Sequence, residues 1–291
     1  MEGKLIIDVA EKYREFCKER EIPFGRISTV NPYDETTLFC PAGMQGYKTK
    51  FKDEHHVGTV ANIQSCIRMN DFDEIGDTTH MLAFDMIGLF SFREMSVMSA
   101  INFWLDFLET LDLVPDYATI HADAPAMGVA YARRSIPFKF DSGCTWTDGE
   151  IGGFCTEFYI DGVEVGNIVN PLGTCIDVGF GLERLTNAAI KAAGGTVVLP
   201  NKAEKLKITI QKIIDSGYKP AAKQQGYVLR KLLRELYASG DSIDHPYFHA
   251  EIDRQQKMLS KYDALKDKHA DKSKEWWWDT HGIAIDEVLS A

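Results

Sequence analysis

The sequence predicts an α+β fold, in which a mainly antiparallel sheet flanked by helices precedes an all-helical module. Three observations predict it. Two long apolar segments, residues 57–69 and 80–92, flank a polar loop, as in an antiparallel pair of strands. Asp161-Gly162 separates two segments rich in β-branched and aromatic residues, which is a strong signal for a two-residue hairpin. Residues 201–291 instead show apolar residues at helical spacing.

The remaining elements follow from local patterns along the chain. They are, in order, a helix over 4–20, extended segments over 24–30 and 36–44, helices over 94–111 and 123–134, a strand over 174–180 and a helix over 181–193. The composition changes at the Gly-containing segment 192–201, a candidate linker. We therefore expect two domains, residues 1–195 and residues 196–291.

The charge of the chain is unevenly distributed. Its formal net charge is −11, yet residues 201–240 carry nine Lys or Arg against three Asp or Glu. An acidic protein with one basic segment can present that segment to a polyanion. The same charges also fit a solvated helical face, so charge alone leaves both interpretations open.

The cysteines and the apolar segments bear on the compartment. The six cysteines form no Cys-x-x-Cys pair, and no Cys/His spacing matches a zinc site. The N-terminal segment carries acidic residues, unlike a signal peptide. The most apolar stretch, residues 81–92, is too short to span a bilayer and contains Asp85. We therefore expect a reduced, cytoplasmic protein without a membrane segment.

The segment DVGFGLERLTNAA, residues 177–189, places an acid and two glycines before a helix that begins with Glu-Arg-Leu. A dinucleotide-binding Gly-x-Gly-x-x-Gly turn does not fit, because Arg184 stands at the third glycine position. Two interpretations remain from this segment alone. One is a plain strand-to-helix turn. The other is a nucleotide site in which the planar guanidinium of Arg184 stacks on a base or reaches phosphates.

A series of motifs supports the nucleotide site. The chain contains, in this order, TLFCPAGMQGYKTKF, QSCIRMNDFDEIGDTTH, FDMIGLFSF, CTE and IDVGFGLERL. The series resembles the catalytic domain of the alanyl-tRNA synthetase family, a class II aminoacyl-tRNA synthetase family. GYVLRKLLREL and WWDTHGIAID resemble that family's helical tRNA-recognition module. The resemblance implies a class II synthetase-like fold over residues 1–195 and the recognition module over residues 196–291.

The resemblance also implies a reaction. ATP and an amino acid would give an aminoacyl-adenylate and pyrophosphate, and the aminoacyl group would pass to a tRNA 3′ hydroxyl. This chemistry relies on positioning and charge stabilisation, which arginines and Mg²⁺ supply. The expected partners are ATP, Mg²⁺, alanine or another small amino acid, and tRNA or another acceptor. The sequence does not decide between a monomer and a family-like homodimer.

Four residues are assigned to ATP by the resemblance. Arg68 would bridge the amino-acid carboxylate and the α-phosphate through bidentate hydrogen bonds. Phe84 would stack on adenine. Arg184 would cover the other face of adenine and reach the γ-phosphate, and Gly181 would let the nucleotide approach the backbone. The alternatives are a surface arginine for Arg68 and core packing for Phe84.

The resemblance places five further residues near the amino acid. Asp177 would pair with the α-ammonium group; its alternative is an N-terminal cap for the helix over 181–193. Asn167 and Gly179 would lie beside the amino acid, and Val169 would line its side-chain pocket. Glu157 would contact the substrate or Mg²⁺.

The sequence departs from the family in the pocket and in the loop before the second long strand. Cys144 stands where the family has a tryptophan that keeps the pocket alanine-sized, although Trp146 is close enough in sequence to compensate. The segment 77–80 lacks the arginine that the family places before the histidine. We therefore expect a changed amino-acid pocket and fewer ATP or acceptor contacts.

The recognition module is mixed. Asp279 matches a residue with which the family reads the acceptor stem, but Ala222 stands where the family's asparagine partner should be. The basic residues Arg230, Lys231 and Arg234 remain, and phosphate contacts hold a nucleic acid without specifying its sequence. These residues are the expected acceptor or RNA contacts.

Three hypotheses follow. The chain ends where the family's editing and C-terminal domains would begin, which favours a stand-alone paralogue with a task outside bulk translation. The leading hypothesis is an aminoacyl-adenylate-forming enzyme that charges a tRNA. The second is an amino-acid ligase that uses a non-tRNA acceptor. The third is a non-catalytic paralogue that binds RNA or a protein partner.

Overall fold

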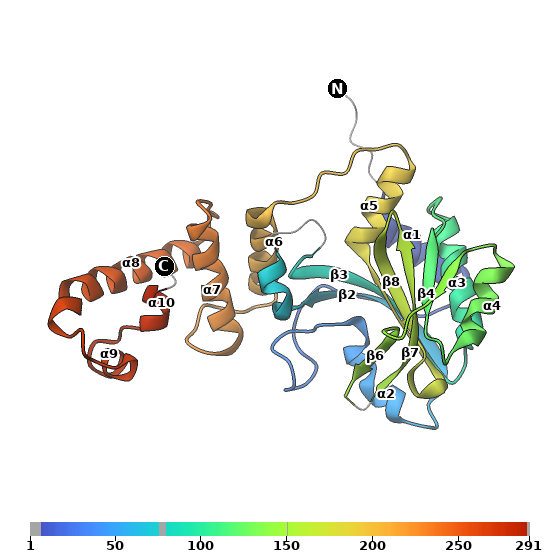
Figure 1. The fold of residues 1–291 in the computed structure, drawn as a ribbon, viewed down its shortest axis with the longest axis horizontal. Coiled ribbons are helices and arrows are strands. Elements are labelled where there is room, and N and C mark those ends of the chain that lie inside the picture. Colours follow the sequence, from blue (N-terminus) through green and yellow to red (C-terminus); the bar gives the residue numbers. More distant parts are fainter. Residues whose placement is uncertain (1–6, 76–79, 150, 290–291) are drawn as a thin grey trace. The chain divides into compact units, whose positions relative to one another are not determined.

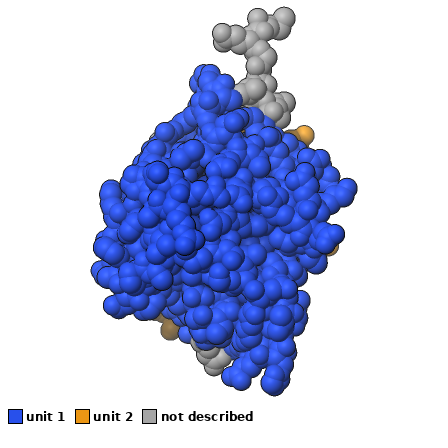
Figure 2. All heavy atoms as spheres, turned by 90° about the vertical axis from the view of Figure 1, so that its right-hand side faces the viewer, with its two compact units in different colours: residues 1–70, 83–199 blue, residues 71–82, 200–291 orange. Residues whose placement is uncertain are grey.

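The computed structural model of the chain describes residues 7–75, 80–149 and 151–289 (Figure 1). The chain divides into two compact units. Unit 1 comprises Met1–Asn70 and Ala83–Leu199, and unit 2 comprises Asp71–Leu82 and Pro200–Ala291. Figure 2 distinguishes the two units by colour. Unit 2 thus includes a segment that interrupts unit 1 in the sequence. The two units therefore cannot be separated by dividing the chain at one position.

Unit 1 is built on a mixed sheet. Within the described residues the sheet has nine strands in the order β1-β2-β3-β9-β8-β7-β4-β5, with β6 paired to β7. The strands are β1 (Phe24–Ile27), β2 (Gly58–Ile67), β3 (Ala83–Phe92), β4 (Tyr117–Ile120), β5 (Phe138–Phe140), β6 (Thr145–Asp148), β7 (Ile151–Ile160), β8 (Val163–Val169) and β9 (Cys175–Gly181). The pairs β1/β2 and β4/β5 are parallel, and the other pairs are antiparallel. The predicted fold class is therefore confirmed.

Helices flank the sheet. They are α1 (Val9–Glu19), α2 (Lys48–Lys52), α3 (Val97–Glu109), α4 (Gly128–Arg133) and α5 (Leu182–Ala192), with short 3₁₀ turns η1 (Gly43–Tyr47), η2 (Met69–Glu74), η3 (Pro125–Met127) and η4 (Pro171–Gly173). Side-chain caps define two of the starts: Asp8 accepts a hydrogen bond from the Glu11 N–H, and Ser96 accepts one from the Ser99 N–H. Helices α1, α3, α4 and α5 all contribute residues to the main core.

The main core lies on one face of the sheet because alternate strand residues point to opposite faces. In β9, Ile176, Val178 and Phe180 belong to this core, whereas Asp177 and Gly179 between them do not. The Trp104 and Phe180 rings stack at 4.2 Å. Burying each such side chain contributes about 2 kcal/mol. This strong alternation fixes the strand registers and leaves the opposite face for other residues.

The elements missed by sequence reasoning are short. The structure contains β4, β5 and β6, of four, three and four residues, which have too few residues to show a clear alternation. Residues 36–44 were expected to be extended, but they form turns that lead into η1. The long strand pair, the hairpin at Asp161-Gly162 and the helices of unit 1 are confirmed.

The C-terminal part of the chain is helical, as predicted. It contains α6 (Lys202–Asp215), α7 (Gln224–Ala238), α8 (Pro246–Leu265), the turn η5 (Lys266–Lys268), α9 (Lys274–His281) and α10 (Ile285–Leu289). A capping box between Asn201 and Glu204 defines the start of α6. The buried Lys205 ammonium donates to the Ile75 carbonyl, which ties α6 to the segment 71–82.

The length and composition of the helices bear on whether any of them could span a membrane. In the part of the chain that the structure describes, none combines the length and the apolar character required to cross a bilayer. The longest, α8, has 20 residues and carries charged side chains along its length.

Candidate functional site

The predicted residues of unit 1 gather on the sheet face opposite the main core. Directly paired strand residues form one row across six strands, and the row is Asn62, Gly88, Gly179, Asn167, Glu157 and Thr119. A neighbouring row contains Phe90, Asp177, Val169 and Cys155. Because opposed residues in a sheet share a face, the topology brings together side chains that are far apart in the sequence.

Arg68 and Phe84 meet at the end of the β2–β3 pair. Arg68 follows β2, and Phe84 lies opposite Cys66 in the register. The guanidinium carbon of Arg68 is 5.2 Å from the centre of the Phe84 ring, within the range of a cation–π contact. Arg68 Nε also donates to the Pro41 carbonyl at 3.0 Å, which holds the side chain in place. Arg68 is therefore anchored to the protein, with its charge beside an aromatic face.

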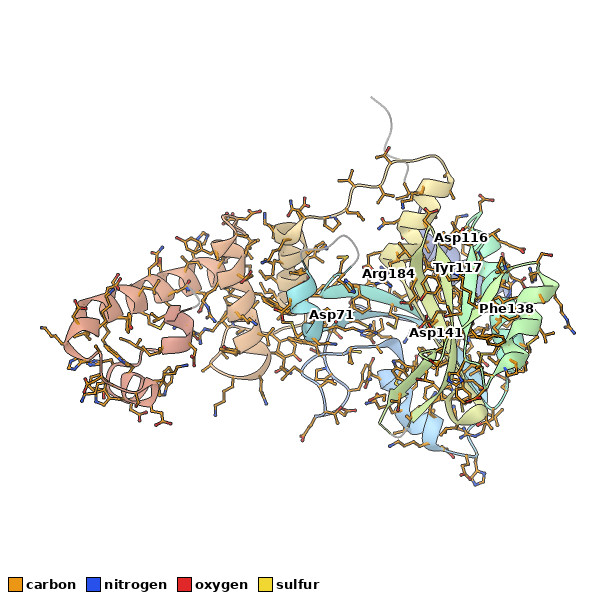
Figure 3. All side chains as sticks on the ribbon, in the orientation of Figure 1. Asp71, Asp116, Tyr117, Phe138, Asp141 and Arg184 are labelled. Carbon is orange, nitrogen blue, oxygen red and sulfur yellow. The ribbon has the colours of Figure 1, made fainter. Side chains whose placement is uncertain are left out.

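Arg184 lies in the first turn of α5, three residues after the helix N-cap Gly181 (Figure 3). Its Nη1 donates to the Glu164 carbonyl at 2.7 Å and lies 3.5 Å from the Glu164 carboxylate. Burial raises the pKa of Glu164, and the nearby Arg184 charge lowers it in part. The neighbouring Glu183 carboxylate accepts the Asp85 N–H at 3.0 Å, which links α5 to β3. These contacts fix the strand-to-helix turn around Arg184.

Asp177 is a buried carboxyl in the middle of β9, 7% exposed. Burial raises its pKa to about 7, and the nearby Asp148 charge adds to the shift. The helix-cap alternative for Asp177 is wrong, because the N-cap of α5 is Gly181 and makes no side-chain cap bond. A buried carboxyl with a raised pKa on a site face is a functional candidate, since a cationic ligand would restore its charge.

Polar side chains contact Glu157 at one end of the site face, next to a small buried cluster. The Glu157 Oε2 accepts hydrogen bonds from the Thr119 hydroxyl at 3.0 Å and from the Tyr159 hydroxyl at 2.9 Å. The buried Cys144 thiol donates to Thr119 Oγ1 at 2.9 Å. Val169 is fully buried beside Cys144 and packs in a small cluster that includes Trp146. Cys144, which departs from the family, and Trp146, which could compensate for it, therefore lie together in this cluster.

Several of these groups escaped sequence reasoning. Thr119 and Tyr159 hold Glu157, and the buried Asn62 side chain lies in the same row as Asn167. Asn62 Nδ2 donates to the Gly43 carbonyl, while in the described part of the protein its buried Oδ1 has no hydrogen-bond partner. The sequence offered little to find them, because the register that opposes them to the predicted residues is a tertiary property.

One group of side chains in this part of the site has metal-binding donors. Among the described residues, ligand atoms of Cys144, Cys155 and Glu157 all lie within 4.8 Å of one another. Cys155 was not singled out from the sequence, although Cys-x-Glu at 155–157 places both side chains on one strand face. The segment 77–80, in which the family's arginine is absent, falls mostly outside the described residues.

The basic residues of α7 divide between the interior and the surface of unit 2. Arg230 Nε lies 2.9 Å and Arg234 Nη1 2.6 Å from the carboxylate of Glu251, which is 3% exposed. Both arginines also contact Glu287. The two guanidinium groups thus have a structural role that needs no RNA.

The other recognition-module residues are exposed. Lys231 lies outside this network, and its Nζ is 4.0 Å from the Phe72 ring centre. Asp279 is exposed on α9, and Ala222 is exposed before α7. Of the predicted acceptor contacts, Lys231 and Asp279 therefore have side chains that a ligand can reach directly.

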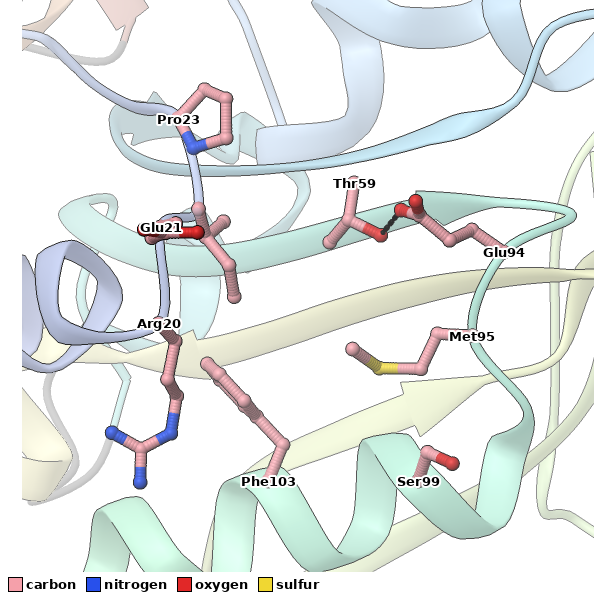
Figure 4. A pocket seen from close by; sticks show the side chains of 9 residues that line it. Arg20, Glu21, Pro23, Thr59, Glu94, Met95, Ser99 and Phe103 are labelled. Carbon is pink, nitrogen blue, oxygen red and sulfur yellow. Dashed lines mark hydrogen bonds between the residues drawn. The ribbon is translucent and has the colours of Figure 1, made fainter.

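A separate pocket of about 620 Å³ lies on the core side of the sheet (Figure 4). Arg20, Met95 and Phe103 contribute to its lining, and the Thr59 hydroxyl there donates to Glu94 at 2.5 Å. None of the predicted site residues lines it. Its position beside α1 and α3 separates it from the site face, so we do not assign the chemistry to it.

Comparison with known proteins shows which families this chain is similar to. Residues 8–133 match the family described as tRNA synthetases class II (A). The alanine–tRNA ligase of Chlamydia trachomatis is 28% identical and covers 74% of this chain and 33% of its own. That of Neisseria gonorrhoeae is 26% identical, covering 90% and 40%, and that of Bdellovibrio bacteriovorus is 32% identical, covering 55% and 19%. Histidyl-tRNA synthetase of Staphylococcus aureus aligns with 81% of this chain and 87% of its own, at 10% identity and a TM-score of 0.46.

Residues 8–133 are thus similar to class II tRNA synthetases. Over most of its length the chain is similar to alanine–tRNA ligases, at 26–28% identity. It spans about a third of the length of the curated relatives that it matches first.

Proposed function

We propose that this protein activates an amino acid with ATP, forming an aminoacyl-adenylate and pyrophosphate, and then transfers the aminoacyl group to an acceptor. The observation that carries the proposal is the gathering of Arg68, Phe84, Asp177 and Arg184 around one face of the sheet. These side chains supply two fixed cations, an aromatic surface and a buried anion. Such a set matches a ligand pair that consists of a nucleotide triphosphate and an amino acid.

ATP would be held by Arg68, Phe84 and Arg184. Adenine would stack on Phe84, beside the anchored guanidinium of Arg68. Arg184 would exchange its hydrogen bonds with Glu164 for contacts with the nucleotide. Arg68 would then face the charge that develops at the α-phosphate, which is the main electrostatic demand of the reaction, and Arg184 would face the γ-phosphate. Gly181 would allow the nucleotide to approach the backbone at the start of α5.

The amino acid would lie over the rows that contain Asp177 and Asn167. An α-ammonium group beside Asp177 favours the ionised carboxylate and so lowers its pKa from about 7. Asn167 and Gly179 are paired in the register, so both border the same position on the face. Val169, opposite Asp177, would define one wall of the side-chain pocket.

Mg²⁺ fits this site through ATP rather than through Glu157. Magnesium prefers oxygen donors and is commonly held by substrate phosphates with one or two carboxylates. Glu157 lies instead beside two thiols, which are poor ligands for magnesium. When bound, Mg²⁺ would neutralise phosphate charge, and Arg68 and Arg184 would orient the same phosphates.

A tRNA end is the acceptor that the helical module favours. We propose that residues 1–195 catalyse activation and that residues 196–291 hold the acceptor, with Lys231 and Asp279 as accessible contacts. A second candidate is a ligase that uses a non-tRNA acceptor. It is favoured by the engagement of Arg230 and Arg234 in internal ion pairs and by Ala222 at the expected asparagine position.

Two assays test these proposals in sequence. Amino-acid-dependent exchange of pyrophosphate into ATP reports activation without any acceptor. Charging of total tRNA with the activated amino acid then reports the acceptor, with Lys231→Ala as the variant and Lys139→Ala in unit 1 as the matched control. Stoichiometric charging supports the tRNA acceptor, whereas activation without charging supports the second candidate.

A further inference from the structure

We propose that Cys144, Cys155 and Glu157 bind a Zn²⁺ ion inside the pocket, and that the ion keeps one coordination position open to the substrate. The metal site stands on the side chains alone. The assignment of the open position to an amino acid rests on the proposed function.

Backbone pairing places the three donors together. The Cys155 N–H donates to the Cys144 carbonyl at 2.9 Å, extending the pairing of β6 with β7 by one residue pair. Cys155 and Glu157 are two residues apart on β7, so their side chains point to the same face. The three ligand atoms lie within 4.8 Å of one another. Two thiols and a carboxylate from neighbouring strands therefore converge on one point.

The spacing matches tetrahedral zinc. Zinc binds thiolate sulfur at about 2.3 Å and carboxylate oxygen at about 2.1 Å, so ligand atoms around it lie about 3.5–3.8 Å apart. The ligand atoms lie within 4.8 Å of one another, so side-chain rotations that move them by roughly 1 Å are enough to reach that geometry. Thiolates select zinc over magnesium and calcium, which prefer oxygen. Three protein ligands leave the fourth position open, as in catalytic zinc sites.

Outer contacts already orient the carboxylate. Thr119 and Tyr159 both donate to Glu157 Oε2, and the Cys144 thiol contacts the same Thr119 hydroxyl. Hydrogen bonds of this kind hold metal ligands in position and tune their basicity. Cys144 and Cys155 are 0% and 1% exposed, so the thiols are protected from bulk solvent. The arrangement resembles a prepared ligand set rather than two thiols that merely fill space.

The location of the cluster connects it to the substrate. Cys155 pairs with Val169, and Val169 pairs with Asp177. Two strand spacings, about 10 Å, thus separate Cys155 from the carboxyl proposed to hold the α-ammonium group. That span accommodates a zinc–donor bond, a short amino acid and an ion pair. We infer an amino acid whose side chain carries a metal-binding hydroxyl or thiol, instead of the methyl group of alanine.

Metal content is the direct test, and it requires no activity. The full-length protein, purified under reducing conditions, is expected to contain about one zinc per chain by mass spectrometry. Cobalt substitution should give the charge-transfer absorption of cobalt–thiolate bonds. Cys144→Ala and Glu157→Gln should lower the zinc content at least tenfold, while Cys17→Ala, a buried cysteine on α1, should retain it. Circular dichroism reports whether each variant is folded.

Two results would overturn the metal site. One is a folded, reduced wild-type protein that takes up neither zinc nor cobalt. The other is a titration of the denatured, non-reduced protein that finds four free thiols in place of six, with the missing pair mapped to Cys144 and Cys155. The second result would assign a cross-strand disulfide.

The substrate assignment has its own test. Pyrophosphate exchange should proceed with serine, threonine or cysteine at least tenfold faster than with alanine, and removal of zinc by a chelator should abolish that preference. Separate assays with the hydroxyl and thiol amino acids distinguish the two donor types. Zinc-independent exchange with alanine would overturn the open-position assignment but leave the metal site. Bound zinc without any exchange would overturn the proposed function and leave the metal site.

Discussion

The guanidinium of Arg68 lies 5.2 Å from the centre of the Phe84 ring, and the Arg68 Nε donates to the Pro41 carbonyl. The cation is thereby fixed at the edge of an aromatic surface before any ligand binds. A cation that is already held in place needs less reorganisation free energy during the reaction than a mobile cation does. This pair accordingly defines the nucleotide side of the proposed site.

Replacement of Phe84 tests this nucleotide side. Phe84→Leu is expected to raise the KM for ATP about 10-fold, because stacking on an aromatic ring contributes about 1–3 kcal/mol per base. The KM for the amino acid should change little. Pyrophosphate-exchange kinetics at varied ATP measures the effect, with Phe140→Leu, an exposed phenylalanine of β5, as the matched control. Equal effects of both substitutions would contradict the assignment.

Arg184 tests the charge that faces the triphosphate. Arg184→Ala is expected to lower kcat/KM for amino-acid activation. The corresponding rise in the activation free energy is on the order of 3 kcal/mol, the scale of losing one preorganised charge contact. Stability should change by less than about 1 kcal/mol, because its ion pair with Glu164 is partly exposed. Arg134→Ala removes a comparable partly exposed ion pair at the end of α4 and should leave kcat/KM unchanged. Turnover like the wild type in the Arg184 variant would refute the site.

Asp177 predicts how stability depends on pH. Its folded pKa of about 7 lies above the unfolded value of 3.8, so the folded state retains a proton that the unfolded state has lost between these values. The Asp177 contribution to the free energy of unfolding is therefore fully present below about pH 4 and is lost as pH rises toward 7, by about 1.4 kcal/mol per pH unit. Asp177→Asn should remove this slope.

Urea denaturation of wild type and Asp177→Asn between pH 4 and 8 measures the difference. The asparagine variant should become relatively more stable as pH rises, and it should lose amino-acid-dependent activation because the anion is gone. A difference in unfolding free energy that does not vary with pH would show that Asp177 titrates normally in the folded protein.

The buried ion pairs of unit 2 are expected to affect its stability, whereas the exposed Lys231 is expected to affect acceptor binding. Glu251→Ala is expected to destabilise unit 2 by about 3–5 kcal/mol, because it removes the buried carboxylate that Arg230 and Arg234 share and leaves both with Glu287 alone. Lys231→Ala should leave stability within about 0.5 kcal/mol, as is usual at the surface, and weaken binding of a tRNA. Thermal unfolding and a filter-binding assay separate the two effects. Strong destabilisation by the lysine change would contradict this division.

Sequence reasoning reached the parts of the fold with strong local signals. The β2–β3 pair and the hairpin at Asp161-Gly162 follow from apolar segments and a turn dipeptide, and the structure contains both. The strands β4 to β6 are too short for a visible alternation; β4 carries Thr119, and β6 directly follows Cys144. The local sequence pattern therefore predicted the central strands of the sheet. It missed the short strands that place Thr119 and Cys144 beside Glu157.

The candidate site shows the same limit. Asp177 and Arg184 stand out because an acid, glycines and an arginine surround one strand-to-helix turn. The convergence of Cys155 with Cys144 depends on which strands pair, and no spacing in the sequence encodes that. Arg230 and Arg234 had the composition of a nucleic-acid contact, but their distant partner Glu251 lies on another helix.

Pyrophosphate exchange into ATP, measured across the common amino acids with zinc-loaded protein, tests the central claim most directly. The account predicts exchange that depends on one or a few small amino acids and is lost in Arg68→Ala and Arg184→Ala. Absence of exchange with every amino acid, from a folded protein that binds ATP, would contradict it.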